Sequence, residues 1–383
     1  MRWGILKHDK HREKENLKLA ETLRNLTYKT SKYSTFKIYE PKERLIFRLP
    51  YYLDRITHHA IMNIMEPIWV NIFIKHTYSC IKDRGIHDVA KDLKYVLQKY
   101  PEETKYCLKL DVRKFYPSID HDILYEILQK KIKDKKLLAL LKEIIYSADG
   151  VPIGNYLSQF FANLYLAYFD HWVKEELKCK FYFRYADDIV ILSDSKEFLR
   201  SVLVSMKLYL HNVLKLELKQ NYQIFPVDSR GIDFVGYRFF HTHVLLRKSI
   251  KVRLFRLIKR YKDKKIDRIE LRRRMQSYFG WLKFCNSKNL LHKIQLETGL
   301  RFSNWNGHIS IDSFKSKNIS KFYGKYVHIV EVMNYSKYFR VHCVYKHKSY
   351  YFESKNKQLF YSIHRYSLPV NFKITPYVRP KKN

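Results

Sequence analysis

One stretch, FYFRYADDIVIL at residues 181–192, constrains the fold of this chain more than any other. Two runs of aromatic and β-branched residues flank a short polar break, a pattern typical of a β-hairpin. Asp187 and Asp188 fall in that break, so we expect both carboxylates at the hairpin tip, where the turning backbone lets them serve one site. Carboxylates crowded among apolar side chains repel each other and are costly to desolvate, and a divalent cation would remove that cost.

Aspartates in hairpin loops often serve only local hydrogen bonding, which is the competing interpretation. A third carboxylate in a similar setting favours the metal site. In CLKLDVRKFYPSID, residues 107–120, Asp111 ends a short alternating run that begins at Tyr106. This run predicts a strand with a carboxylate at its exit.

The YADD sequence, the upstream strand that ends in aspartate with an aromatic residue five positions later, and a glycine-containing loop between them together resemble the palm of reverse transcriptases. The resemblance covers roughly residues 35–300 and implies an α+β, right-hand polymerase of fingers, palm and thumb with an antiparallel palm sheet. It implies RNA-templated nucleotidyl transfer from deoxynucleoside triphosphates. It also implies two Mg²⁺ ions, for which Mn²⁺ can substitute, with Asp111, Asp187 and Asp188 as catalytic residues and metal ligands and Val112 as a further ligand.

The charge of the chain agrees with a polyanionic partner. Lys and Arg number 74 against 37 Asp and Glu, a net charge of +37. A membrane surface is the competing polyanion, but the most apolar run, residues 61–74, is broken by polar residues and Pro67, so we expect a buried core segment and no membrane partner. The first residues lack the apolar core of a signal peptide, and the five cysteines show no paired spacing, which favours a reducing cytoplasm. The family resemblance implies a prokaryotic or phage-encoded protein.

A chain of 383 residues exceeds one typical core. We expect an N-terminal helical cap at residues 1–38, fingers at 39–105, a palm with interleaved fingers helices at 106–245, a basic helical thumb at 246–302 and a small β-rich basic appendage at 303–383. Short Tyr-rich alternating runs such as YVHIVEV predict the strands of the appendage. Its Tyr and Lys side chains suit either stacking on RNA or an ordinary sheet with a basic surface.

Three groups of residues are candidates for nucleotide binding. Lys42 and Arg44 lie near the turn of FKIYEPKERLIFR, where the resemblance implies cations that bind the triphosphate; a solvated surface turn is the alternative. Tyr116 stands where the family places an aromatic ring beneath the sugar, which would clash with a 2′-hydroxyl, and Phe115 replaces it if the register is shifted by one.

The third group lies in DGVPIGNYLSQ, residues 149–159, a stiff loop before an amphipathic helix. A simple loop-to-helix junction is one interpretation. The stretch also resembles the family's template and nucleotide platform, which places Ile153 and Gly154 beside the incoming nucleotide. Most reverse transcriptases carry Gln at the position of Ile153. IGNYLSQ is similar to the signature of diversity-generating retroelement enzymes, which implies cDNA synthesis from a template repeat RNA with errors opposite adenine, and a small basic accessory variability protein.

The region after the hairpin contains candidates for template and primer binding. GIDFVGYRFF, residues 231–240, resembles the primer grip, which implies contacts from Gly236 and Tyr237. Lys219 is a candidate proton donor, although the spacing also allows Asn221.

The segment from residue 247 to 274 contains 14 basic and three acidic residues, interleaved with apolar residues at helical spacing at Leu254, Leu257, Ile258 and Ile269. A solvated helix face is one interpretation. A thumb that follows the phosphates of an RNA/DNA hybrid is the other, with contacts from Lys251, Arg253, Arg256 and Lys259.

Two alternatives to diversity generation remain open on the sequence. One is a retron, phage-defence or group II intron reverse transcriptase. The other is a catalytically idle RNA-binding protein with the same fold, against which the intact set of three aspartates argues.

Overall fold

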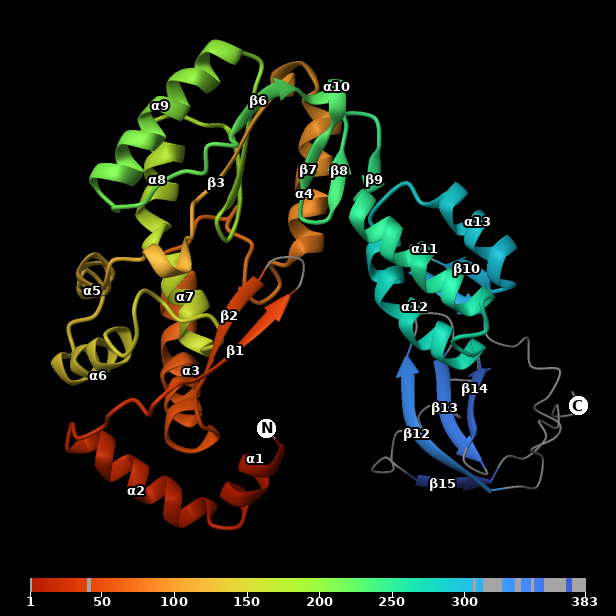
Figure 1. Cartoon of the computed structure of the whole chain (residues 1–383), viewed down its shortest axis with the longest axis horizontal. Helices are drawn as coiled ribbons and strands as arrows, with labels where there is room; N and C mark the ends of the chain where they lie inside the picture. Colours follow the sequence, from red (N-terminus) through yellow and green to blue (C-terminus); the bar gives the residue numbers. More distant parts are fainter. Residues whose placement is uncertain are drawn as a thin grey trace, which may run out of the picture. The chain divides into compact units, whose positions relative to one another are not determined.

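The structure is a computed structural model and describes residues 2–39, 43–305, 308–312, 326–334, 339–345, 348–354 and 370–373 (Figure 1). The chain divides into two compact units. Unit 1 comprises residues 1–254 and 284–286, and unit 2 comprises residues 255–283 and 287–383. The finer division into five parts stays a prediction.

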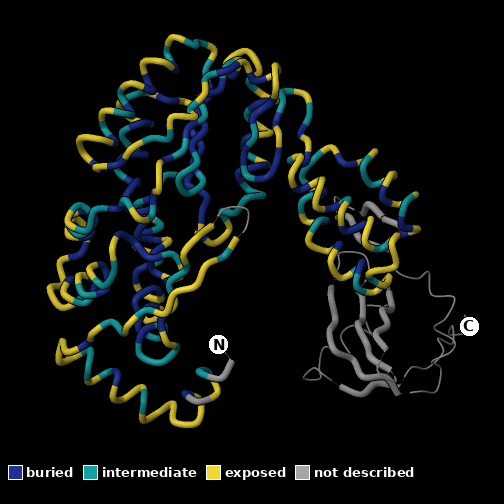
Figure 2. The backbone as a smooth tube through the Cα atoms, viewed as in Figure 1, coloured by how far each residue is buried: buried dark blue, intermediate teal, exposed yellow. Residues whose placement is uncertain are grey.

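Unit 1 is built on a four-stranded antiparallel sheet, the central sheet, with the strand order β4-β5-β3-β6. Its strands are β3 (Tyr106–Asp111), β4 (Phe181–Tyr185), β5 (Asp188–Ser193) and β6 (Gln223–Pro226). The β-branched and aromatic residues of β4 and β5 suit a sheet covered on both faces, and most residues of both strands are buried. Figure 2 shows the buried positions along the backbone in dark blue. The predicted α+β class is confirmed.

Alternate positions on these strands point to opposite faces of the central sheet. One face carries Leu108, Tyr182 and Ile191, which join the main apolar cluster. Residues of α7 (Tyr156–Tyr165), α8 (Ala167–Glu175) and α9 (Lys196–Asn212) belong to the same cluster, so helices cover this face. The opposite face carries Asp111 and Asp188, whose pairing follows from the strand register.

The remaining helices of unit 1 that are longer than one turn are α1 (Arg2–Asp9), α2 (Arg12–Arg24), α3 (Ile56–Val70), α4 (Ile86–Lys99), α5 (His121–Gln129) and α6 (Lys135–Ile145). As expected for a core segment, α3 buries Met62, Met65 and Trp69. No helix among the described residues is long and apolar enough to span a bilayer.

Residues 120–145 form two helices, each of which begins after an aspartate. Asp120 caps α5 by accepting hydrogen bonds from the amides of Asp122 and Ile123. Asp134 caps α6 in the same way. A carboxylate that accepts such bonds favours a new helix start, so the chain breaks at Asp134 where the apolar spacing alone gives no signal.

Two smaller antiparallel groups complete unit 1. β1 (Ser34–Tyr39) pairs with β2 (Glu43–Arg48) as a hairpin. After the short α10 (Val227–Arg230), β7 (Ile232–Phe234), β8 (Tyr237–Phe239) and β9 (Val244–Leu246) form a three-stranded sheet.

Unit 2 begins inside α11 (Lys248–Lys262) and contains α12 (Arg268–Leu282) and α13 (Lys288–Thr298). Leu254, Leu257 and Ile258 are buried as expected, whereas Ile269 is 78% exposed. The break between α11 and α12, where Asp267 caps α12, changes the helical phase and explains the exposed Ile269.

In the C-terminal region, β10 (Arg301–Trp305) pairs with β11 (His308–Asp312). A second sheet has the order β14-β13-β12-β15, formed by β12 (Tyr326–Asn334), β13 (Phe339–Tyr345), β14 (Lys348–Ser354) and β15 (Val370–Lys373). Among these described strands, β12 contains the run YVHIVEV, as predicted, whereas no run named from the sequence corresponds to β10, β11 or β15.

Candidate active site

The aspartate pair lies at the tip of the β4–β5 hairpin, as the sequence predicts. Tyr185 pairs with Asp188, which leaves Ala186 and Asp187 as a two-residue loop. Ala186 has a φ of +54°, in the left-handed region that an L-residue adopts only at some cost. This turn places Asp187 outside the paired strands. Neighbouring side chains of a strand point to opposite faces of the sheet, but this rule does not apply to Asp187, so its carboxylate can lie on the same side as that of Asp188.

Three carboxylates gather at this end of the central sheet. Asp111 is the ladder partner of Asp188, and Asp187 lies in the turn directly before Asp188. Burial raises the pKa of Asp187 to about 6, and the nearby Asp111 carboxylate adds to the increase. Burial also raises the pKa of Asp188 to about 6, although the Lys109 ammonium opposes the increase. The site therefore holds more negative charge than its surroundings solvate well.

Two lysines partly neutralise these carboxylates. Lys219 Nζ lies 2.5 Å from Asp111 Oδ2, and Lys109 Nζ lies 3.5 Å from Asp188 Oδ1. The amide of Lys219 also donates to the carbonyl of Asp111, so the backbone fixes Lys219 beside the site, whereas Asn221 is exposed. Lys109 was not among the residues singled out from the sequence, although its position two residues before Asp111 puts it on the same strand face.

The donor set suits a hard divalent cation. Asp111 Oδ1 and Asp188 Oδ1 are buried and accept no hydrogen bond, and buried carboxylate oxygens left in this state are the ligands that Mg²⁺ prefers. No group of three His, Cys, Asp or Glu side chains in the described part of the chain is already arranged around one point. Since Lys219 and Lys109 occupy part of the carboxylate surface, metal binding would require both ammonium groups to move away.

The glycine-containing loop packs against the segment that follows Asp111. The amide of Val151 donates to the carbonyl of Tyr116, and a Cβ on Gly150 would lie 2.7 Å from the same oxygen. Tyr116 is partly exposed, while Phe115 is buried in the core, so Tyr116 is the residue of the two that is open to a ligand. Burial raises the pKa of Tyr116, and Asp187 adds to the increase.

The loop also contacts the β1–β2 hairpin. The amide of Phe47 donates to the carbonyl of Ile153, at 2.8 Å. A Cβ on Gly154, whose φ is +126°, would lie 2.2 Å from the Phe47 carbonyl oxygen, so only glycine fits. Arg44 is exposed on β2, and Lys42 lies outside the described residues.

A polar cleft of about 230 Å³ opens beside Gly154, and its lining residues include Arg55, His59, Tyr156 and Gln159. The rings of His59 and Tyr156 stack with centroids 4.5 Å apart. No local pattern in the sequence points to Arg55 or His59, because the cleft joins α3 to a loop about 100 positions later in the chain.

The predicted template and primer residues differ in their exposure to solvent. Lys251, Arg253, Arg256 and Lys259 are exposed on α11. Tyr237 is fully buried, with its hydroxyl 3.2 Å from His87 Nδ1, so its side chain is not available to a primer. The alternation of β8 points this ring inward, while Gly236, which has a φ of +88°, lies in the turn before β8 and stays a predicted primer contact.

The sequence of the chain matches a known protein family. The family model described as "Reverse transcriptase (RNA-dependent DNA polymerase)" matches residues 35–239, which is more than half of the chain. Telomerase from Candida albicans in complex with a TWJ fragment of telomeric RNA is similar in structure over 72% of this chain and 61% of that chain, with 12% identity and a TM-score of 0.45.

Three curated relatives are similar in sequence. Protein YkfC of Escherichia coli K12 is 24% identical, over 53% of this chain and 65% of the relative. The group II intron-encoded protein LtrA of Lactococcus lactis is 22% identical, over 49% of this chain and 43% of the relative. The retron Ec73 reverse transcriptase of Escherichia coli is 27% identical, over 45% and 58%. The chain thus spans between 43% and 65% of the length of these relatives.

Proposed function

This chain belongs to the reverse transcriptase (RNA-dependent DNA polymerase) family and has the right-hand polymerase fold, and we propose that it synthesises cDNA on an RNA template. The observation that carries the proposal is the register of β3 and β5, which brings Asp111 and Asp188 together and leaves Asp187 in the turn beside them. A catalytically idle protein with the same fold would have no need for three partly buried carboxylates at the same end of the central sheet.

The metal ligands would be Asp111, Asp187 and Asp188, with the backbone of Val112. When bound, two Mg²⁺ ions supply a lowered pKa for the primer 3′-hydroxyl and stabilise the leaving pyrophosphate. Lys219 lies where it can hold or deliver a proton at the site, because its ammonium contacts Asp111.

The nucleotide would lie between the Asp111 end of β3 and the glycine loop. Tyr116, whose carbonyl accepts from an amide of that loop, would favour deoxyribose by excluding a 2′-hydroxyl. Arg44 and Lys42 would contribute cationic charge to the triphosphate. The exposed cations of α11 would bind the phosphates of the RNA/DNA hybrid.

The finer proposal is diversity generation. Ile153 and the IGNYLSQ sequence support it, because an apolar residue replaces a hydrogen-bonding one next to the nucleotide site. The enzyme would then copy a template repeat RNA with errors at adenine and work with a small basic accessory protein. The similarity to both a retron reverse transcriptase and a group II intron protein supports those two functions as alternatives, and high uniform fidelity of the cDNA would favour them.

Primer extension on an RNA template tests the activity. Asp187→Asn and Asp188→Asn should each lower the extension rate by at least about 100-fold, since removal of one metal ligand removes transition-state stabilisation. Hybrid binding should stay nearly unchanged. Asp194→Asn, an exposed residue just beyond β5, is the matched control. Extension at the wild-type rate in either active-site variant would refute the assignment, and hybrid binding without extension by the wild type would support the idle-protein alternative.

A further inference from the structure

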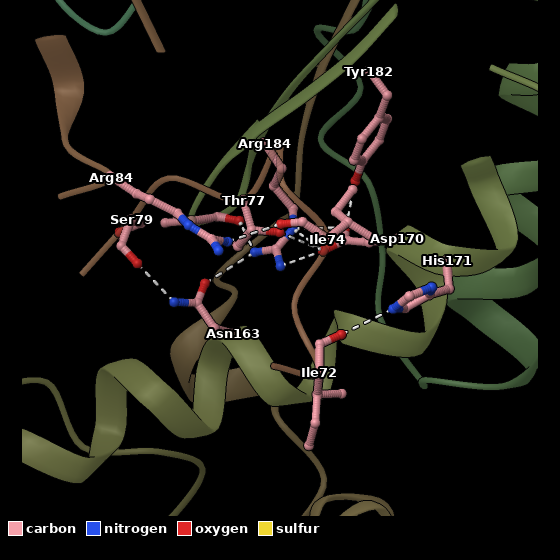
Figure 3. A network of polar contacts seen from close by, with 11 residues as sticks. Ile72, Ile74, Thr77, Ser79, Arg84, Asn163, Asp170, His171, Tyr182 and Arg184 are labelled. Carbon is pink, nitrogen blue, oxygen red and sulfur yellow. Dashed lines mark hydrogen bonds and ion pairs between the residues drawn. The ribbon is translucent and has the colours of Figure 1, made fainter. Parts of the chain in front are cut away.

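A fully buried ion pair lies beneath the catalytic hairpin (Figure 3). Arg184 of β4 and Asp170 of α8 are both 0% exposed, and Arg184 Nη2 lies 2.5 Å from Asp170 Oδ2. Arg184 Nε adds contacts of 2.8 and 2.9 Å to the two carboxylate oxygens. Because Arg184 pairs with Ile189, its side chain lies on the helix-covered face of the central sheet, opposite to Asp188.

Other groups complete the hydrogen bonding of this pair. Asp170 also accepts from the Tyr182 hydroxyl at 2.6 Å and from the Thr77 hydroxyl at 3.1 Å. Arg184 Nη1 donates to Asn163 Oδ1 at 3.1 Å, and Asn163 in turn donates to the carbonyl of Ser79 at 2.7 Å. Asp170 and Asn163 thus hold the guanidinium in one orientation.

A buried ion pair is weak evidence for a stabilising role, because apolar residues of similar volume often serve the fold as well or better. Stability of the fold therefore does not explain why an arginine occupies this buried position. The second contact of Nη1, with the loop of the hairpin, suggests another role.

Arg184 Nη1 donates to the carbonyl oxygen of Ala186 at 3.0 Å. Ala186 is the loop residue with a φ of +54°, a conformation that costs an L-residue free energy and relaxes when nothing holds it. On the other side of the loop, the amide of Val112 donates to the carbonyl of Asp187 at 3.3 Å. The carbonyl groups on both sides of the Asp187 Cα atom, those of Ala186 and Asp187, are therefore hydrogen-bonded.

We propose that Arg184 is a positioning residue, whose guanidinium, oriented by Asp170 and Asn163, holds Ala186 in its left-handed conformation and so aims the Asp187 carboxylate at Asp111. The proposal rests on the proposed function, since it assigns a use to a contact next to a metal ligand. Asn163 belongs to α7, which follows directly on the Ile153–Gly154 loop, so one guanidinium links the nucleotide platform to the metal site.

Single-turnover primer extension at increasing Mg²⁺ concentration tests this role. Arg184→Lys keeps the charge beside Asp170 but cannot reach Asn163, Asp170 and Ala186 together, because an ammonium lacks the planar fork. We expect the maximal rate to fall by roughly 10-fold or more and the Mg²⁺ requirement to rise, with unchanged affinity for the hybrid.

The Ala186→Gly background separates positioning from simple packing. Glycine adopts positive φ without strain, so the loss of rate caused by Arg184→Lys should be about fivefold smaller in this background than in the wild type, as measured by a double-mutant cycle. A purely structural role of the ion pair predicts the same loss in both backgrounds, and that result would overturn the proposal.

Tyr182→Phe is the matched control, since it removes a hydrogen bond from the same Asp170 carboxylate without touching the loop. It should lower thermal stability and leave the Mg²⁺ dependence unchanged. If Arg184→Lys does not fold, Asn163→Ala is the deciding variant, because it retains the ion pair and removes one of the two partners of Nη1, the side chain that orients the guanidinium for its contact with Ala186. A raised Mg²⁺ requirement in Asn163→Ala supports positioning, and a wild-type requirement contradicts it. A wild-type protein with no extension at all would instead count against the proposed function.

Discussion

Asp111 and Asp188 are direct partners in the antiparallel ladder between β3 and β5. Like charges opposite each other destabilise a sheet, so this register works against folding unless something neutralises the pair. A slip of one residue would turn one of the carboxylates to the opposite face of the sheet. The buried Leu110–Ile189 pair next to them stabilises the present register and thereby keeps Asp111 and Asp188 on one face of the sheet.

The cost of this arrangement predicts that Asp188→Asn stabilises the metal-free protein at about pH 7.5. The pKa of Asp188 is raised from 3.8 to about 6, so the ionised carboxylate destabilises the fold above pH 6. This penalty disappears as the pH falls from 6 to below 3.8. Two pKa units set an upper limit of about 3 kcal/mol. Thermal unfolding without Mg²⁺ should show a higher midpoint for the variant, and a midpoint below that of Asp194→Asn would contradict this prediction.

Gly154→Ala should disrupt the contact between the glycine loop and the β1–β2 hairpin. The new Cβ would lie 2.2 Å from the Phe47 carbonyl oxygen, and the backbone at φ +126° is strained for alanine, so we expect the free energy of unfolding to fall by more than about 2 kcal/mol. Urea unfolding measures this fall, and hydrogen exchange of the Phe47 amide reports the contact itself. Gly4→Ala, on a helix with room for a methyl group, should be neutral or slightly stabilising. Unchanged exchange at Phe47 would show that the loop contact is dispensable.

Replacement of Lys251, Arg253, Arg256 and Lys259 by Gln should weaken binding to RNA/DNA hybrids of any sequence. The slope of log affinity against log salt should become shallower by about one unit for each phosphate that the variant no longer neutralises. The matched control replaces Arg12, Lys14, Lys18 and Arg24 on α2, which are also exposed and carry the same total charge. Equal effects of the two sets would show that net charge, not α11, binds the hybrid.

Ile153→Gln should lower the error frequency of cDNA synthesis several-fold, because one buried hydrogen bond of about 1 kcal/mol near the nucleotide changes discrimination by that much. The largest drop is expected opposite template adenine. Deep sequencing of cDNA made on one mixed-sequence RNA, with the accessory protein where required, measures both. Ile153→Leu is the apolar control, and identical error spectra of the Gln and Leu variants would mean that Ile153 only packs.

His58 should make the fold acid-sensitive. Burial lowers the pKa of His58 from 6.5 to about 4, and its Nε2 has no hydrogen-bond partner. The folded protein therefore binds fewer protons than the unfolded chain between these values, and stability is lost as the pH falls from 6.5 to 4, by up to about 3 kcal/mol. Unfolding of His58→Gln, compared with wild type at each pH, should show a smaller loss. His59→Gln, at the exposed neighbouring position, should follow the wild type.

The central sheet and its carboxylates were predictable because strand composition and alternation carry the information locally. Tyr237 and the polar cleft were not, since burial of that ring and the joining of α3 to Gly154 depend on contacts between distant segments. Arg184 does carry a local signal. A charged residue inside an otherwise apolar strand must be paired when both faces are covered, although the sequence does not say that Asp170 is the partner.

The covering of β4 has a consequence for the behaviour of the protein in solution. β4 is the end strand of the central sheet, and end strands with open backbone groups pair readily with strands of other molecules. Here the amide of Arg184 donates to the carbonyl of His76, and the carbonyl of Arg184 accepts from the amide of Tyr78. Residues 76–78 thus pair with the open edge of β4 and prevent the β4–β5 hairpin from serving as a starting point for aggregation.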